Sequence, residues 1–113
     1  MTLNYATLNG FTGSETIYQQ PMFKTKYTEG VKFLGDSVNW LLTDILAQLD
    51  YNPKLRGNSF VAIKIKPAIG QIVYTDGDDT EIEIQEYGIM DGLDNQRINL
   101  FATDGVLMLA REY

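Results

Sequence analysis

Hydrophobic residues recur with a helical rhythm between residues 37 and 50. They stand three or four positions apart, which places them on one face of an α-helix. Polar residues such as Thr43 and Asp44 fall on other faces. The Asn52-Pro53 pair follows, and the residue before a proline is disfavoured in the helical conformation. The pattern predicts a helix over about 37–50 whose buried face is made by Val38, Leu41, Leu42, Ile45, Leu46 and Leu49.

From residue 60 onward the pattern changes to a period of two, which is typical of strands with one buried face. In the first segment Val61, Ile63 and Ile65 share one face, and lysines share the other. The Asp104-Gly105 pair lies between two apolar runs and predicts a β-hairpin, because a type I′ turn requires positive φ. We expect strands at residues 60–66, 71–75, 80–87, 99–103 and 106–110.

The region before residue 37 has weaker helix signals. Residues 3–8 could form a short helix, and residues 12–15 have the spacing of a capping box, which predicts a helix to about Gln19. Thr28 is a candidate N-cap for a helix over 29–34. The Gly35-Asp36 pair that follows is expected to break or bend the chain there.

These elements predict an α+β fold in a single domain spanning residues 1–113. Helices come first and antiparallel strands follow, an order that is typical of this class. We expect N-terminal helices, with the main helix at about 37–50, to pack on one face of a mainly antiparallel sheet of about four or five strands. The 113 residues, 44% of them hydrophobic, are enough for such a core.

The composition excludes much of the usual chemistry of active sites. The chain contains no His and no Cys, and so lacks the common acid–base group, the thiol nucleophile and the usual zinc ligands. Ser14, Ser37 and Ser59 have no His to activate them. We therefore expect a protein that is not an enzyme and has no cofactor or metal. An enzyme that binds a metal through carboxylates alone is the remaining catalytic alternative.

Targeting signals are also absent from the sequence. The N-terminal residues have neither the basic region nor the apolar run of a signal peptide. No apolar stretch approaches the length of a membrane span. A chain without cysteine fits a reducing compartment. These features favour a cytoplasmic protein that does not enter a membrane.

The negative charge is concentrated in the C-terminal part of the chain. Residues 67–113 contain two Lys/Arg and ten Asp/Glu, whereas residues 1–66 contain seven Lys/Arg and five Asp/Glu, for a net charge of −6. An acidic surface repels phosphate backbones and attracts basic partners, so we expect a protein partner and no direct binding of nucleic acid. The alternative is that the acidity only keeps a small protein soluble.

One acidic segment is a candidate partner-binding site. In the strand over 80–87 we expect Ile82 and Ile84 to point inward and the alternating Glu81 and Glu83 to point outward. The alternative is an ordinary solvated sheet face. Residues 76–81 resemble the start of a calcium loop, but their spacing departs from an EF-hand and favours a polar turn with Gly77 at positive φ. The candidate acidic residues are Asp78, Asp79, Glu81, Glu83 and Glu86.

Aromatic residues form a second group of candidates. Trp40 lies to the side of the main apolar stripe. We expect it either to pack under the N-terminal helices or to anchor a partner, since tryptophan is frequent in interface hot spots. The aromatic residues before this helix are interleaved with lysines, a pattern that could bind single-stranded nucleic acid or build a second core layer. They are Phe11, Tyr18, Phe23, Tyr27 and Phe33.

Four segments occur in a fixed order along the chain: FTGSE at 11–15, YTEGVKFL at 27–34, WLLTDI at 40–45 and DGVLML at 104–109, with EY at the end. Together they resemble an uncharacterised bacterial and phage-associated family that is known only as a domain of unknown function. The resemblance implies a complete domain and a fixed structural place for Trp40. It implies no activity and no catalytic residues. Relatives of this kind occur in mobile genetic elements.

These observations lead to the hypothesis of a non-enzymatic protein-binding module that acts through its acidic surface. Its sharper form is an inhibitor of a host defence complex, of the anti-CRISPR kind, whose acidic hairpin occupies a basic nucleic-acid groove on the target. The alternative is a structural domain of a mobile element that self-associates. In that case edge strands and the flank at Trp40 would support a homodimer.

Overall fold

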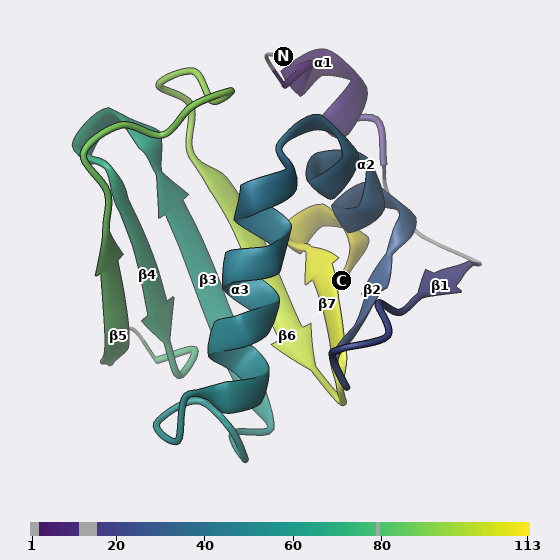
Figure 1. Ribbon diagram of the computed structural model, residues 1–113, viewed down its shortest axis with the longest axis vertical. Coiled ribbons are helices and arrows are strands. Elements are labelled where there is room, and N and C mark those ends of the chain that lie inside the picture. The colour runs from purple at the N-terminus through teal and green to yellow at the C-terminus, as the bar shows by residue number, and fades with distance from the viewer. Residues whose placement is uncertain (1–2, 12–15, 79) are drawn as a thin grey trace.

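The computed structural model describes residues 3–11, 16–78 and 80–113. This part of the chain has no helix that is both long enough and apolar enough to cross a membrane. Along the chain (Figure 1), the described residues form α1 (Tyr5–Leu8), β1 (Ile17–Tyr18), β2 (Lys26–Thr28), α2 (Glu29–Ser37), α3 (Asn39–Tyr51), β3 (Phe60–Lys66), the 3₁₀ turn η1 (Pro67–Ile69), β4 (Gln71–Thr75), β5 (Glu81–Glu86), β6 (Ile98–Thr103), β7 (Val106–Leu109) and the 3₁₀ turn η2 (Ala110–Glu112).

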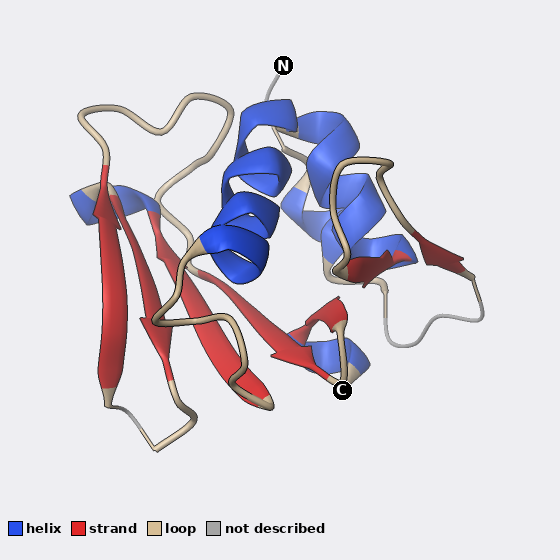
Figure 2. Cartoon of the chain, turned by 60° about the horizontal axis from the view of Figure 1, so that its bottom comes forward, coloured by secondary structure: helices blue, strands red, loops and turns tan. Residues whose placement is uncertain are grey.

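The strands of the described chain form one seven-stranded sheet in the order β1-β2-β7-β6-β3-β4-β5. Neighbouring strands are antiparallel except β2 and β7, which run parallel, so the sheet is mixed. Helices α2 and α3 lie together on one side of the sheet (Figures 1 and 2). We call the side that faces away from them the outer face.

The predicted α+β class and the main helix are confirmed. Helix α3 covers residues 39–51, and the side chains of its predicted apolar face are buried. The expected count of four or five strands was too low, whereas the sheet is mainly antiparallel, as predicted, with β2 and β7 as the parallel pair. The segment predicted to be helical as far as Gln19 contains strand β1 instead. The proposed capping box at 12–15 lies outside the described residues.

The predicted break at Gly35-Asp36 is wrong. Helix α2 continues through both residues to Ser37, and an ion pair of 2.6 Å joins Lys32 to Asp36 one turn apart. The break falls instead at Val38, whose φ of −136° and ψ of 81° separate α2 from α3. Gly35 is buried against the side chain of Leu42, so a glycine at this position lets the two helices approach closely.

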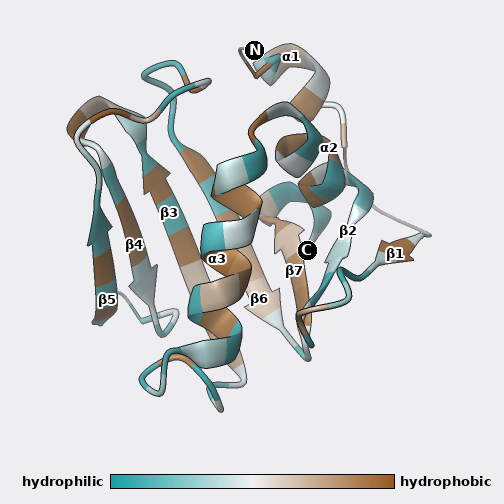
Figure 3. Cartoon of the chain, in the orientation of Figure 1, coloured by the Kyte–Doolittle hydropathy of each residue, from teal (hydrophilic) through white to brown (hydrophobic). Residues whose placement is uncertain are grey.

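The core lies between α3 and the central strands. Figure 3 shows hydrophobic bands along α3 and along the strands behind it. Side chains that point toward the helices from neighbouring strands meet in register, as Ile63 does with Leu100 and Tyr74. Tyr74 is completely buried, and its hydroxyl donates a hydrogen bond of 2.6 Å to Gln85 Oε1. This bond gives the polar end of a core side chain a partner.

The predicted hairpin at Asp104-Gly105 is confirmed. Both residues have positive φ, 53° and 77°, and the flanking residues Thr103 and Val106 are paired. This is the backbone conformation that a type I′ turn needs. The hairpin places β7 between β6 and β2.

The C-terminal turn η2 packs against the beginning of α2. Glu112 Oε1 accepts hydrogen bonds from the Thr28 hydroxyl at 2.7 Å and from the Leu109 amide at 3.0 Å. Thr28 occupies the N-cap position, as predicted, but its side chain bonds Glu112 and does not cap the helix. A Cβ atom on Gly30 would lie 2.6 Å from both Glu112 Oε1 and Leu109 Cδ1.

Glycine at positions 30 and 35 is therefore expected to be required for packing. Gly30→Ala and Gly35→Ala should each lower the free energy of unfolding by about 1–3 kcal/mol, because overpacking exceeds the better helix propensity of alanine. Chemical denaturation monitored by circular dichroism measures the change. Gly88→Ala is the matched control, since a Cβ there meets nothing within 4 Å. Equal stability of Gly30→Ala and wild type would contradict this packing of η2 on α2.

Candidate functional site

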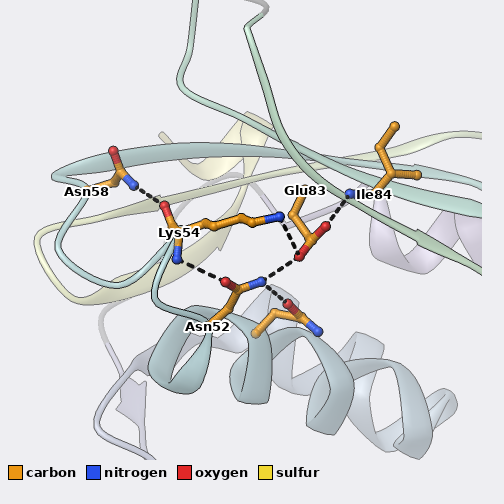
Figure 4. A network of polar contacts seen from close by, with 6 residues as sticks. Asn52, Lys54, Asn58, Glu83 and Ile84 are labelled. Carbon is orange, nitrogen blue, oxygen red and sulfur yellow. Dashed lines mark hydrogen bonds and ion pairs between the residues drawn. The ribbon is translucent and has the colours of Figure 1, made fainter.

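Glu83 links β5, the strand at one edge of the sheet, to the end of α3 (Figure 4). Its Oε2 atom accepts a hydrogen bond of 2.8 Å from Asn52 Nδ2 and lies 3.9 Å from Lys54 Nζ. Asn52 is the C-cap residue of α3, and its Oδ1 atom accepts a bond of 2.9 Å from the Lys54 amide. Its Nδ2 atom also donates to Gln48 Oε1 at 2.8 Å. Asn52 therefore bonds simultaneously to the helix, the loop after it and the sheet edge.

The charge of Glu83 is stabilised by this network. The hydrogen bond from Asn52 is the main cause that lowers the pKa of Glu83 below its ordinary value of 4.5. The Ile84 amide and the Lys54 ammonium also lower this pKa, whereas burial raises it. Glu83 is thus a structural carboxylate that stays ionised at neutral pH.

The orientation of β5 differs from the alternation predicted for it. A register irregularity in the β4–β5 pairing shifts the strand, so that Tyr74 pairs with Glu83 while Thr75 pairs with Glu81. Glu83 consequently lies on the helix side, and Ile84 is 39% exposed. Ile82 packs against the core, as expected. The prediction that Ile84 points inward and Glu83 outward is therefore wrong, because one extra residue in a strand reverses the faces that follow.

The other candidate acids do not share one surface with Glu83. Glu81 and Asp78 are exposed at the start of β5 and in the turn before it. Glu86 lies at the opposite end of the strand, where Gln71 Nε2 donates to it at 3.2 Å. Asp79 lies outside the described residues. The structure therefore separates the predicted acidic hairpin into a pair at the turn, a structural glutamate and a distant glutamate.

The turn between β4 and β5 is organised by Asp76. Its Oδ1 atom accepts hydrogen bonds from the amides of Asp78 at 2.9 Å and Thr80 at 3.3 Å. Gly77 has a φ of 95°, which confirms the predicted polar turn. Within the described ranges no three acidic side chains are grouped so that they could hold a metal ion.

An aromatic cluster of Phe60, Phe101 and Tyr113 lies on the outer face. Ring centroids are 5.2 Å apart between Phe60 and Phe101, 5.2 Å between Phe101 and Tyr113, and 6.0 Å between Phe60 and Tyr113. Tyr113 remains 73% exposed. The neighbouring outer positions on β7 are Val106 and Met108, both only partly buried. This end of the outer face is therefore apolar and accessible.

The acidic turn borders the aromatic cluster. A Cβ atom on Gly77 would lie 3.3 Å from the Phe60 ring, so the turn lies beside the cluster. The β6–β7 turn lies at the same end of the sheet (Figure 1) and contributes the exposed Asp104. We call this combined feature the aromatic–acidic surface, which consists of Phe60, Phe101, Tyr113, Asp76, Asp78 and Asp104.

The sequence contains part of the signal for this surface. Phe60 and Phe101 occupy the strand positions opposite the buried stripe, where polar side chains are usual. They stand 41 positions apart in sequence and Tyr113 follows the last strand, so their contact depends on the strand order. That order could not be deduced from the periodicity.

Trp40 makes contacts within the protein and is not part of the aromatic–acidic surface. Its ring lies 5.2 Å from the ring of Tyr87, and its Nε1 atom donates a hydrogen bond of 3.1 Å to the carbonyl of Asp91. Tyr87 in turn donates to Asp44 Oδ2 at 2.9 Å, and burial together with this bond raises the pKa of Tyr87. Trp40 therefore packs against the segment after β5 and not beneath the N-terminal helices, while its alternative role as an anchor for a partner stays a prediction.

The aromatic residues before α3 belong mainly to the core. Phe23 and Tyr27 are buried, and Phe11 and Phe33 pack against each other with centroids 5.7 Å apart. Lys32 lies over the ring of Tyr18 at 5.4 Å from its centroid. This arrangement agrees with the second core layer that was one of the two interpretations of the pattern.

The fold defines a small α+β domain whose sheet is covered by helices on one side and carries the aromatic–acidic surface on the other. The chain belongs to a protein family of unknown function, DUF6876, which matches residues 2–113. Neither a curated protein nor a solved structure matches the chain. The family relationship confirms the predicted membership of a family without known activity.

The lowered pKa of Glu83 predicts a pH-dependent contribution to stability. A lowered pKa stabilises the folded state above pH 4.5, and this contribution is lost as the pH falls through the pKa of the folded protein. Glu83→Gln should therefore be less stable than wild type at pH 7, and the difference should shrink toward pH 3. Urea denaturation at several pH values measures it. Glu81→Gln, at an exposed position on the same strand, should show no such change.

Proposed function

We propose that this chain is a non-enzymatic, cytoplasmic protein-binding module that uses the aromatic–acidic surface. The observation that supports this most is the position of the acidic turn beside Phe60, whose ring would lie 3.3 Å from a Cβ atom on Gly77. Exposed aromatic side chains supply large apolar area at interfaces, and adjacent carboxylates select for positive charge. The matching partner is a protein segment that presents Arg or Lys together with apolar side chains.

Arginine fits both parts of this surface. A guanidinium can stack on an aromatic ring and donate hydrogen bonds to a neighbouring carboxylate at the same time. Asp78 and Asp104 are exposed, and neither forms an ion pair within the described residues. Their charge is therefore available to a partner. The same charge disfavours nucleic acid, whose phosphates would be repelled.

The sharper form of the proposal is inhibition of a host defence complex, in the manner of an anti-CRISPR protein. Here the acidic turn would occupy a basic groove that otherwise receives nucleic acid. Fewer acidic residues support this idea than the sequence predicted, because Glu83 bonds to Asn52 and Glu86 lies at the far end of β5. The residues to examine are therefore Asp78 and Glu81.

Tyr113→Ala should strongly weaken partner binding and leave the fold intact. Removing a central interface aromatic costs about 2 kcal/mol or more, which is roughly a 30-fold loss of affinity. Pull-down from nuclease-treated host lysate, quantified by mass spectrometry, compares the variant with wild type. Ile89→Ala is the matched control, because Ile89 is 81% exposed but does not belong to this surface.

Charge reversal tests the acidic half of the surface. Asp78→Lys should remove the same partner, whereas Asp91→Lys, with an identical change in net charge at another exposed position, should retain it. A partner that is retained by both Tyr113→Ala and Asp78→Lys would contradict the proposal. Equal loss in both charge variants would show that only net charge matters.

Self-association is the second candidate function, and the mixed charge of the outer face favours it. Lys64 and Lys66 lie on the same face of β3 as Phe60, at the end away from the acidic turns. Two copies related by a two-fold axis could therefore place opposite charges together around their aromatic clusters. Light scattering over a concentration series should then show a dimer mass that Tyr113→Ala reduces to the monomer. A constant monomer mass in the wild type would exclude this function.

A further inference from the structure

A pocket of about 460 Å³ lies where α1, the beginning of β6 and η2 meet. Leu8, Ile98 and Leu109 form its apolar part. The side chains of Asn9, Gln96 and Asn99 also line it. Its size falls within the range of pockets for small molecules, which is about 300–1,000 Å³. Apolar walls with a few convergent polar groups are the usual composition of such sites.

The charge of this pocket is opposite to that of its surroundings. Arg97 and Arg111 are the two cationic residues of the segment 67–113, against ten acidic residues. Both arginines line the pocket, and its lining contains no Asp or Glu among the described residues. Two guanidinium groups at one pocket repel each other unless an anion lies between them. The pocket thus brings together both positive charges of residues 67–113, a segment that is otherwise strongly negative.

The two arginines are held differently. Arg111 Nη1 donates a hydrogen bond of 3.0 Å to the carbonyl of Asn9, which orients the guanidinium and leaves its other N–H groups to donate elsewhere. Arg97 is exposed and forms no hydrogen bond or ion pair with the rest of the described chain. The adjacent acid Glu112 directs its Oε1 atom to Thr28 and Leu109. It therefore does not neutralise Arg111 through that atom.

A neutral donor lies at the wall of the same pocket. The hydroxyl of Tyr5 is 3.4 Å from the carbonyl oxygens of both Asp94 and Gln96, and both contacts are long for a hydrogen bond of a hydroxyl. Burial raises the pKa of Tyr5, so this hydroxyl keeps its proton. Asp94 belongs to the neighbouring loop, but its side chain is not part of the lining.

We propose that this pocket binds a small molecule with an oxyanion, a phosphate or a carboxylate, between Arg97 and Arg111. The planar guanidinium donates two parallel N–H bonds to either group. The amides of Asn9, Gln96 and Asn99 provide further donors, and the apolar wall contacts the organic part of the ligand. The site is independent of the aromatic–acidic surface and of the function proposed for it.

The test is a titration of the ¹⁵N-labelled full chain, followed by amide chemical shifts, with inorganic phosphate, a nucleoside monophosphate and citrate as separate probes. At least one probe should produce saturable shifts at Asn9, Gln96 and Asn99. Arg97→Gln should weaken that binding about tenfold or more, because it removes charge-assisted hydrogen bonds. Arg56→Gln is the control, since it makes the same charge change at a residue that lines a different cavity.

The probes separate the possible ligands. Tighter binding of the nucleoside monophosphate than of phosphate indicates an organic phosphate, equal binding indicates free phosphate, and binding of citrate alone indicates a carboxylate. Arg111→Gln removes the bond to Asn9, so its thermal unfolding is measured in parallel, while Arg97→Gln tests the site without that change. The proposal is overturned if no probe gives saturable shifts up to about 10 mM, a range that includes millimolar affinity. It is equally overturned if Arg56→Gln weakens binding as much as Arg97→Gln.

Discussion

Burial of one sheet face beneath α2 and α3 is the constraint on which the remaining features depend. The apolar stripe of α3 covers the central strands, and Gly35 allows α2 to lie close beside it through Leu42. Since both helices lie on the same side, the outer face must be stabilised by contacts between its own side chains. The aromatic cluster and the outer-face side chains of neighbouring strands, such as Phe101 and Met108, supply part of these contacts. They also leave apolar area accessible, which gives the molecule a surface suited to recognition.

The strongest periodic signals predicted their elements correctly. The stripe of α3, the alternation of β3 and the Asp104-Gly105 hairpin depend on local sequence, and all three are present. Strands β1 and β2 have two and three residues, which is too short for a period of two to be visible. Strand β2 pairs with β7, and β1 pairs only with β2, so both depend on the position of β7 in the sheet, which is a property of the whole chain.

The candidate site was predicted only in part, for physical reasons. The acidity of the β4–β5 turn was visible in composition, but the register irregularity beside Tyr74 reversed the side on which Glu83 lies. One extra residue on one strand leaves no trace in the alternation of residue types, although it changes the face on which later side chains lie. The role of Asn52 could not be predicted either, because nothing in a turn residue before proline indicates a hydrogen bond to Glu83, 31 positions away in the sequence. Long-range polar contacts of this kind depend on the tertiary arrangement of the chain.

The position of β7 has a consequence for the order in which the fold can be completed. Strand β7 lies between β2 and β6, although it is the last strand along the chain. Until residues 106–109 leave the ribosome, the pair β1–β2 has no neighbour through which to join the other four strands. The N-terminal half, which contains the helices, is thus synthesised early, but β2 can pair with β7 only after β7 has been synthesised. During translation, the nascent chain therefore exposes the edges of β2 and β6 until β7 has been synthesised.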